Sequence, residues 1–342
     1  MTAITPVQIS PEAAALHGKA LVVDALNICN WSRDIFEGWR AGGFTTVSCT
    51  CALWENFRDT IANIVQWNRW FEEHADLIMP VRTVADIATA KATNRTGVIL
   101  SWQNSSSIED QLGYIGIFKQ LGVGIVQLTY NTQNYSGAGY LEPNDSGLTG
   151  FGREVVSEMN KVGILVDLSH VGDKTAADTI AYSAQPVAYT HILPRALKNV
   201  PRNKPDELIK AVAEKGGMVG LSMFSPGLPA GNDATVEDYL DAMEHMIKLV
   251  GEDHVGIGTD YSQDHPRPGP FLQWCNMDKG YARELTKFGS VKIEKPKGVA
   301  KLHELPNLTA AMLRRGWSEE TILKLLGANW VKLLGQVWSP SK

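Results

Sequence analysis

Short apolar runs recur along the chain and alternate with segments of helical periodicity. The runs are continuous rather than alternating in polarity, which is typical of parallel strands buried on both faces. Eight such runs predict strands, at residues 21–26, 46–51, 97–103, 124–130, 164–170, 186–191, 217–224 and 254–261. The intervening segments predict helices at 56–73, 110–121, 151–162, 204–215 and 236–250, several of which end at a glycine suited to a helix C-cap.

The order of these elements predicts an α/β fold. Eight strands that alternate with helices favour a closed (β/α)8 barrel, the TIM-barrel fold, over an open sheet. An open doubly wound sheet would usually have a glycine-rich turn after its first strand, and Asp24-Ala25-Leu26-Asn27 contains no glycine. We therefore expect a single barrel domain over residues 1–342.

Two stretches interrupt the alternation. Residues 131–150 are rich in Asn, Gly and Ser, and predict a loop insertion after the fourth strand. Residues 262–305 contain several prolines and predict a second insertion after the eighth strand. Both follow the carboxyl ends of strands, where barrel enzymes build their active sites. The tail, residues 306–335, predicts two helices that are separated at Arg315-Gly316.

Polar residues end three of the predicted strands. His170 ends the fifth strand, His191 the sixth and Asp260 the eighth. In a barrel these side chains converge on one mouth, where two imidazoles and a carboxylate suit a divalent transition metal. The carboxylate could instead be a general base, and each residue alone could be an ordinary hydrogen-bonded rim residue. Arg202, in a proline-flanked loop, suits capture of a substrate carboxylate, although a surface arginine would look the same.

The composition and charge of the chain exclude some classes of binding partner. The chain has 342 residues, of which 44% are hydrophobic and 20% charged, with a net charge of −5 and no run of Lys or Arg. We therefore expect neither a nucleic-acid nor a membrane partner. No apolar run approaches the roughly 18 residues that span a bilayer, and residues 1–11 lack the features of a secretory signal. Four scattered cysteines do not suggest a disulfide framework. These features predict a reduced, soluble, cytoplasmic protein.

A longer set of motifs resembles those of a known family. The set comprises residues 147–156 (Gly-Leu-Thr-Gly-Phe-Gly-Arg-Glu-Val-Val), Asp167-Leu168-Ser169-His170, Thr190-His191, Arg202-Asn203, Gly256-Ile257-Gly258-Thr259-Asp260 and Gly327-Ala328-Asn329-Trp330. In this order they resemble the membrane (renal) dipeptidase family, peptidase family M19 of the amidohydrolase superfamily. The resemblance runs from about residue 20 to residue 335, and it implies a metal-dependent hydrolase barrel and a homodimer.

The resemblance also implies a set of site residues. Members of the family bind two zinc ions, one held by a His and an Asp of the first strand and the other by two His of the fifth and sixth strands, with a bridging Glu from the third. His170 and His191 match the second pair. Asp260 matches the acidic residue that acts on the bound water and the substrate amine, and Arg202 matches the residue that holds the substrate carboxylate.

Four other positions depart from the family pattern. Leu26 and Ile28 occupy the first-strand ligand positions, and Gln103 occupies that of the bridging glutamate. Tyr130 stands where the family has a histidine that steadies the reacting carbonyl. Leucine and isoleucine cannot bind zinc, and an amide oxygen is a weaker ligand than a carboxylate. This divergent member is therefore predicted to have lost one metal site, and its ordinary dipeptidase activity is in doubt.

The leading hypothesis is a mononuclear metallohydrolase that acts on a small carboxylate-bearing amide, ester, lactone or dipeptide. It requires one divalent ion, for which zinc is expected. The predicted metal ligands are His170 and His191, with Gln103 as a weak ligand and Asp260 as a further one. The predicted catalytic residues are Asp260 and Tyr130, and the predicted substrate-binding residues are Arg202, Asn131 and Tyr130.

Two other functions fit the same residues. The first is a metal-free acid–base enzyme, an isomerase or lyase, in which the two histidines, Asp260 and Tyr130 transfer protons. The second is a non-catalytic barrel that binds a small molecule. Substrate identity depends on the two insertions, whose shapes the sequence does not determine.

Overall fold

Eight parallel strands form a barrel in the computed structural model, which describes residues 7–266, 269–285 and 293–339. The strands follow one another around the sheet in the order β1-β2-β4-β5-β6-β7-β8-β9. Main-chain bonds between the ends of β1 and β9, from Asp260 N to Leu26 O (3.0 Å) and from Ile28 N to Tyr261 O (2.8 Å), close the ring. The eight strands are β1 Val23–Asn27, β2 Thr46–Ala52, β4 Thr96–Trp102, β5 Val123–Gln127, β6 Leu165–Asp167, β7 Ala188–Ile192, β8 Met218–Leu221 and β9 Val255–Ile257.

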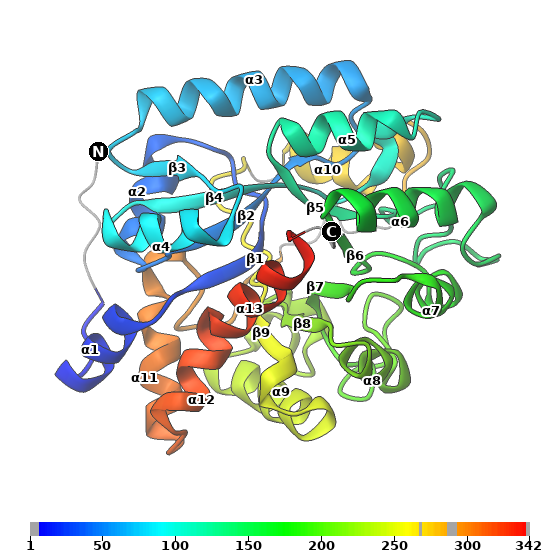
Figure 1. Ribbon diagram of the computed structural model, residues 1–342. Coiled ribbons are helices and arrows are strands. Elements are labelled where there is room, and N and C mark those ends of the chain that lie inside the picture. Colours follow the sequence, from blue (N-terminus) through cyan, green and yellow to red (C-terminus); the bar gives the residue numbers. More distant parts are fainter. Residues whose placement is uncertain (1–6, 267–268, 286–292, 340–342) are drawn as a thin grey trace.

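The (β/α)8 prediction is thus confirmed, and each of the eight predicted strands coincides with one strand of the barrel. A further short strand, β3 (Ile78–Pro80), pairs with β4 and was not predicted. Helices surround the barrel (Figure 1). They are α1 Pro11–Lys19, α2 Arg33–Ala41, α3 Phe57–Glu73, α4 Val84–Ala92, α5 Gly113–Gln120, α6 Gly150–Val162, α7 Asp173–Tyr182, α8 Asp206–Glu214, α9 Val236–Val250, α10 Pro270–Asn276, α11 Pro306–Arg314, α12 Glu319–Leu323 and α13 Asn329–Val337.

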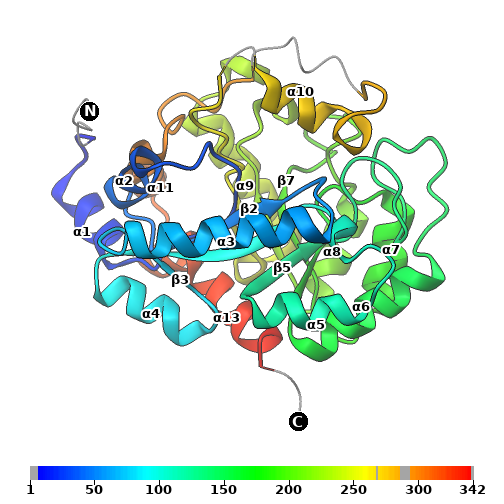
Figure 2. The same ribbon diagram turned by 90° about the horizontal axis from the view of Figure 1, so that it is seen from above.

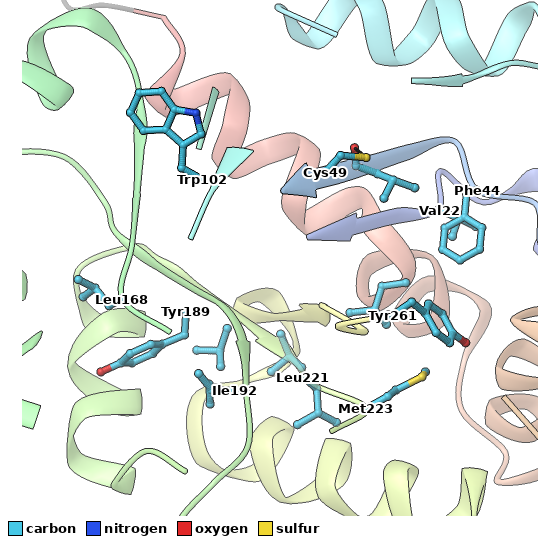
Figure 3. Packing of buried hydrophobic residues seen from close by; sticks show 14 of the residues in the cluster. Val22, Phe44, Cys49, Trp102, Leu168, Tyr189, Ile192, Leu221, Met223 and Tyr261 are labelled. Carbon is cyan, nitrogen blue, oxygen red and sulfur yellow. Dashed lines mark hydrogen bonds between the residues drawn. The ribbon is translucent and has the colours of Figure 1, made fainter. Parts of the chain in front are cut away.

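The outward-facing side chains of the strands pack against these helices. Figure 3 shows part of this layer, with Trp102, Tyr189 and Leu221 projecting from β4, β7 and β8. Trp102 meets Phe118 of α5 edge-on, with ring centroids 4.5 Å apart. On the opposite side of the barrel, the hydroxyl of Tyr239 in α9 donates to Leu221 O at 2.8 Å. Burial on both faces explains why the strands read as continuous apolar runs.

The tail closes one end of the barrel. In Figure 2, α13 lies at one end of the strands and α10 at the other. Trp330 of α13 is 1% exposed, and its Nε1 donates to Ile257 O at 3.0 Å. Gly256 leaves room for the indole, since a Cβ there would lie 2.4 Å from Trp330 Nε1. The cavity lined by the predicted site residues lies at the other end, where side chains of α10 contribute to its wall.

Replacing Trp330 with alanine is expected to lower the free energy of unfolding by about 3–5 kcal/mol, the usual range for a fully buried tryptophan. Urea unfolding followed by circular dichroism measures the loss. Trp330→Phe keeps one six-membered aromatic ring and loses the bond to Ile257 with part of the buried volume, so its loss should be clearly smaller. Equal losses for the two variants would show that the indole volume does not support this end of the barrel.

The segment after β9 contains α10 and returns to the barrel before α11. Residues 267–268 and 286–292 of the predicted insertion at 262–305 lie outside the described residues, as do residues 1–6 of the N-terminal segment. Among the helices of the described part, none combines the length and the apolar character that a bilayer span requires. All four cysteines are free thiols.

Candidate active site

Two histidines meet at the barrel mouth. His191 belongs to β7, and His170 lies three residues beyond the end of the neighbouring strand β6. Their Nε2 atoms are 3.0 Å apart, and both rings are buried. The fifth and sixth predicted strand ends are therefore brought together, as the sequence analysis expected.

The other ring nitrogen of each histidine is held by a side chain. His170 Nδ1 lies 2.7 Å from Asn131 Oδ1, and because an amide oxygen only accepts, Nδ1 donates. His191 Nδ1 lies 2.7 Å from Thr190 Oγ1, whose own proton goes to Asp167 Oδ2 at 2.7 Å. His191 Nδ1 must then be the donor in its bond to Thr190. In this arrangement both Nε2 atoms carry lone pairs, and the two lone pairs point at each other.

Asp167 anchors this arrangement and was not predicted as a site residue. The carboxylate is 1% exposed and accepts hydrogen bonds from four groups. The donors are Ser169 N (3.0 Å), Ser169 Oγ (2.6 Å), Thr190 N (3.0 Å) and Thr190 Oγ1 (2.7 Å). Because the carboxylate fixes the Thr190 hydroxyl, it also fixes which nitrogen of His191 is protonated.

Burial keeps both rings neutral. It lowers the pKa of His170 well below the ordinary value, and the charges of Arg202 and His191 act in the same direction. Burial likewise lowers the pKa of His191 well below its ordinary value, with Arg202 as the next cause. A neutral imidazole is the form that binds a metal, so both histidines are ready to do so at physiological pH.

Asp260 and Arg202 face the same cavity, of about 130 Å³, as His170. Asp260 follows β9 with a left-handed backbone (φ 57°), a conformation that is uncommon for a residue other than glycine. Burial raises the pKa of Asp260, while Lys295 and then Arg202 oppose the shift. The Arg202 guanidinium donates to the main-chain oxygens of Ser169 (2.6 Å) and His191 (2.8 Å) and so ties β6 to β7.

The remaining predicted residues line the same cavity. Tyr130 stacks on the His170 ring, with centroids 4.4 Å apart and an interplanar angle of 25°. Asn131, which supports His170, also has a left-handed backbone (φ 60°). Gln103 is 2% exposed, and its amide nitrogen donates to Thr50 Oγ1 at 3.0 Å. The amide oxygen is therefore the Gln103 atom suited to a ligand in the cavity.

At the first-strand side of the mouth, the side chains of Leu26 and Ile28 offer no metal ligand. Leu26 is buried, and Ile28 lines the cavity with its apolar side chain. The nearby carboxylate of Asp24 is occupied, because it accepts from Thr259 N (2.8 Å), Thr259 Oγ1 (2.5 Å) and Asn27 Nδ2 (2.6 Å). Burial raises the pKa of Asp24 to about 6 despite these bonds.

These contacts decide how many metal ions the residues fit. Two nitrogens 3.0 Å apart can both lie about 2.1 Å from one shared ion, the usual zinc–nitrogen distance. In the described part of the chain, however, no three side chains of His, Cys, Asp or Glu come together as a metal-binding group. The histidine pair therefore fits one ion, and the residues do not fit a two-metal centre.

A closed (β/α)8 barrel with paired histidines, an aspartate and an arginine at one mouth defines a class, the amidohydrolase-like barrels. Comparison with known proteins identifies the branch. Residues 32–269 match the family model of membrane dipeptidases, Peptidase family M19. The chain belongs to this family of hydrolases.

Several similar proteins are consistent with this assignment. An amidohydrolase from Pseudomonas aeruginosa is 49% identical, with a TM-score of 0.93 over 95% of this chain and 99% of the other. Dipeptidase tcpJ from Claviceps purpurea is 28% identical over 89% of this chain and 68% of its own length. This chain spans 62–68% of the length of three fungal dipeptidases. A metallo peptidase from Rhodobacter sphaeroides, solved with a phosphinate mimic of the dipeptide L-Ala-D-Ala, shares the fold, with 22% identity and a TM-score of 0.76 over 93% of this chain and 99% of the other.

Proposed function

We propose that this chain is a mononuclear metal-dependent hydrolase that acts on a small carboxylate-bearing amide, ester, lactone or dipeptide. The observation that supports it most directly is the pair of neutral imidazoles whose Nε2 lone pairs meet at 3.0 Å beside Asp260 and Arg202. Lone pairs that face each other at this distance repel unless a cation or proton lies between them. Membership of the family and the similarity to an amidohydrolase support the same reaction class.

In this proposal His170 and His191 hold one divalent ion, for which zinc is expected. Such an ion supplies a Lewis acid that acidifies water and polarises a carbonyl. Gln103 and Asp260 are the further candidate ligands. The residue set supports a single ion because Leu26 and Ile28 offer no donor atoms on the opposite side.

Four side chains of the protein have the other roles in the proposed reaction. The Asp260 carboxylate accepts a proton from the attacking water, which its place in the cavity permits. Arg202 has five N–H groups, of which two donate to main-chain oxygens, and the others suit a substrate carboxylate. Burial raises the pKa of Tyr130 well above its ordinary value, so the hydroxyl stays protonated and can donate to a developing oxyanion. Asn131 keeps His170 in the productive tautomer.

Metal analysis tests this function. Gently purified protein should contain about one transition-metal ion per chain, and chelation should abolish turnover of small amides or esters until metal is added back. His191→Ala should lose the metal, whereas His303→Ala, outside the cavity, should retain it. Turnover that survives chelation would favour the metal-free acid–base alternative instead. A cytoplasmic location, a homodimer and a single-domain organisation stay predictions of the sequence.

A further inference from the structure

A second buried cation faces the cavity from the segment between β9 and α11. Lys295 is 8% exposed and lines the cavity together with Asp260 and Arg202. Its ammonium donates to two main-chain oxygens at the end of β9, those of Thr259 (3.3 Å) and Asp260. A lysine is rarely this buried without a specific role for its charge.

The contact with Asp260 has a structural consequence. Asp260 has a left-handed backbone, which costs free energy and persists only where its surroundings hold it. Lys295 bonds to the carbonyl of this residue, and Asp260 N donates to Leu26 O at 3.0 Å. Lys295 thus helps to hold the main chain that presents the carboxylate to the cavity.

The Lys295 ammonium lies on the first-strand side of the mouth. Ile28 of the β1 end lines the cavity with Lys295, and the charge of Lys295 acts on the pKa values of Cys29 after β1 and His191 of β7. This is the side on which Leu26 and Ile28 offer no metal ligand. A fixed positive charge therefore lies where the residues exclude a second metal ion.

The charges of the wall indicate the ligand. Among the described residues that line this cavity, Arg202 and Lys295 are cationic and Asp260 alone is acidic. Because the histidines are neutral, the net charge of these lining side chains is positive before any metal binds. A wall with two separated cations favours a ligand with two negative or partly negative groups.

We infer that Lys295 is the fixed cation that serves in place of a first-strand metal ion and binds an anionic oxygen of the substrate opposite the carboxylate held by Arg202. The inference rests on the proposed function in taking the mouth as the site of a carboxylate-bearing substrate. It deepens that function by naming the substrate class, a carboxylate with a second anionic or strongly polarised oxygen.

Binding to metal-free protein tests the inference. Chelated full-length protein is titrated by calorimetry with the phosphinate mimic of L-Ala-D-Ala, which has both a carboxylate and a phosphinate. Lys295→Gln keeps a donor for the main-chain oxygens and removes the charge, so it should weaken binding by at least about tenfold, as expected for loss of a buried charge contact. Lys295→Arg should stay within about threefold of the wild type.

Lys297 provides the matched control. It lies two residues further on, is exposed, and pairs with Asp233 at 3.0 Å. Lys297→Gln should bind like the wild type. Equal affinities of Lys295→Gln and wild type would overturn the inference, and so would absence of wild-type binding at millimolar probe.

A measurement on the wild type alone keeps the test decisive if Lys295→Gln does not fold. N-acetyl-D-alanine, whose carboxylate is its only anionic group, should bind at least about tenfold more weakly than the phosphinate, and equal binding would overturn the inference. The outcomes separate the two proposals. Suppose that Lys295→Gln loses phosphinate binding while the wild type holds no stoichiometric metal. This result would support the role of Lys295 and contradict the proposed mononuclear hydrolase. One bound metal with no effect of Lys295→Gln would do the reverse.

Discussion

Asp260→Asn is expected to lower kcat by about 10²–10⁴-fold, the usual effect of removing a general base, with a much smaller change in KM. The amide cannot accept a proton from water at neutral pH, whereas the substrate carboxylate would still meet Arg202. Asparagine also tolerates the left-handed backbone that Asp260 adopts, so the fold should be retained. Steady-state kinetics on the most active amide or ester found by screening measure the effect.

The pH profile provides a second readout of the same residue. Burial raises the pKa of Asp260, with Lys295 and Arg202 opposing the shift. A base works when ionised, so kcat should rise with pH through a limb displaced upward from the ordinary carboxyl range, and Asp260→Asn should lack that limb. Asp264 is the matched control, because it is exposed, left-handed (φ 64°) and outside the cavity. A pH limb retained in Asp260→Asn, or an equal loss in Asp264→Asn, would contradict the role of Asp260.

The barrel could be predicted because its strands are buried on both faces. Continuous apolar runs marked all eight strands, and longer amphipathic segments such as α3 and α9 marked helices. The short helices α1, α2, α4 and α7 were not predicted. Each has only nine or ten residues, which is short for recognising a helical repeat. The equally short α5 and α8 were predicted because an apolar stripe in each is followed by a glycine. β3 has three residues and was missed for the same reason.

The strand order alone could predict the part of the site that lies at the strand ends. His170 and Asp260 follow strands and His191 lies near the end of β7, so the barrel itself brings them to one mouth. Lys295 lies in a segment whose path the sequence does not determine, and a lysine there has no distinguishing local pattern. Asp167 was visible as part of Asp167-Leu168-Ser169-His170, yet its bonds to Thr190 depend on the register of two neighbouring strands.

The two sides of the mouth differ in a chemically consistent way. On the β6–β7 side, buried polar bonds fix two neutral imidazoles. On the β1–β9 side, Asp24 bonds Thr259 and Asn27, apolar side chains replace ligands, and Lys295 contributes positive charge. An ion beside Lys295 would meet both repulsion and a lack of ligands. The site is therefore better suited to one metal and one ammonium than to two metals.

Asp167→Asn is expected to weaken metal binding by about 10–100-fold, the usual effect of altering the partner of a ligating histidine. The asparagine oxygen can keep the bonds that Asp167 Oδ1 accepts, but its NH₂ would then donate to Thr190 Oγ1. Thr190 would turn its proton toward His191 Nδ1, which would move the ring proton to Nε2. That nitrogen would lose its lone pair for the metal, although the fold would change little. Competition with a chromogenic zinc chelator measures the affinity, and ¹⁵N chemical shifts of the imidazole report the tautomer.

Thr190 offers the control within the same chain of bonds. Thr190→Ser keeps the hydroxyl between Asp167 and His191, so zinc affinity should stay close to that of the wild type. Thr190→Val removes the acceptor for His191 Nδ1 and should weaken zinc binding as Asp167→Asn does. Wild-type affinity in Asp167→Asn, together with an unprotonated Nε2 on His191, would show that the carboxylate does not set the tautomer. Loss of affinity with the tautomer unchanged would point instead to the charge of Asp167, because a carboxylate raises the basicity of the ligand beyond orienting it.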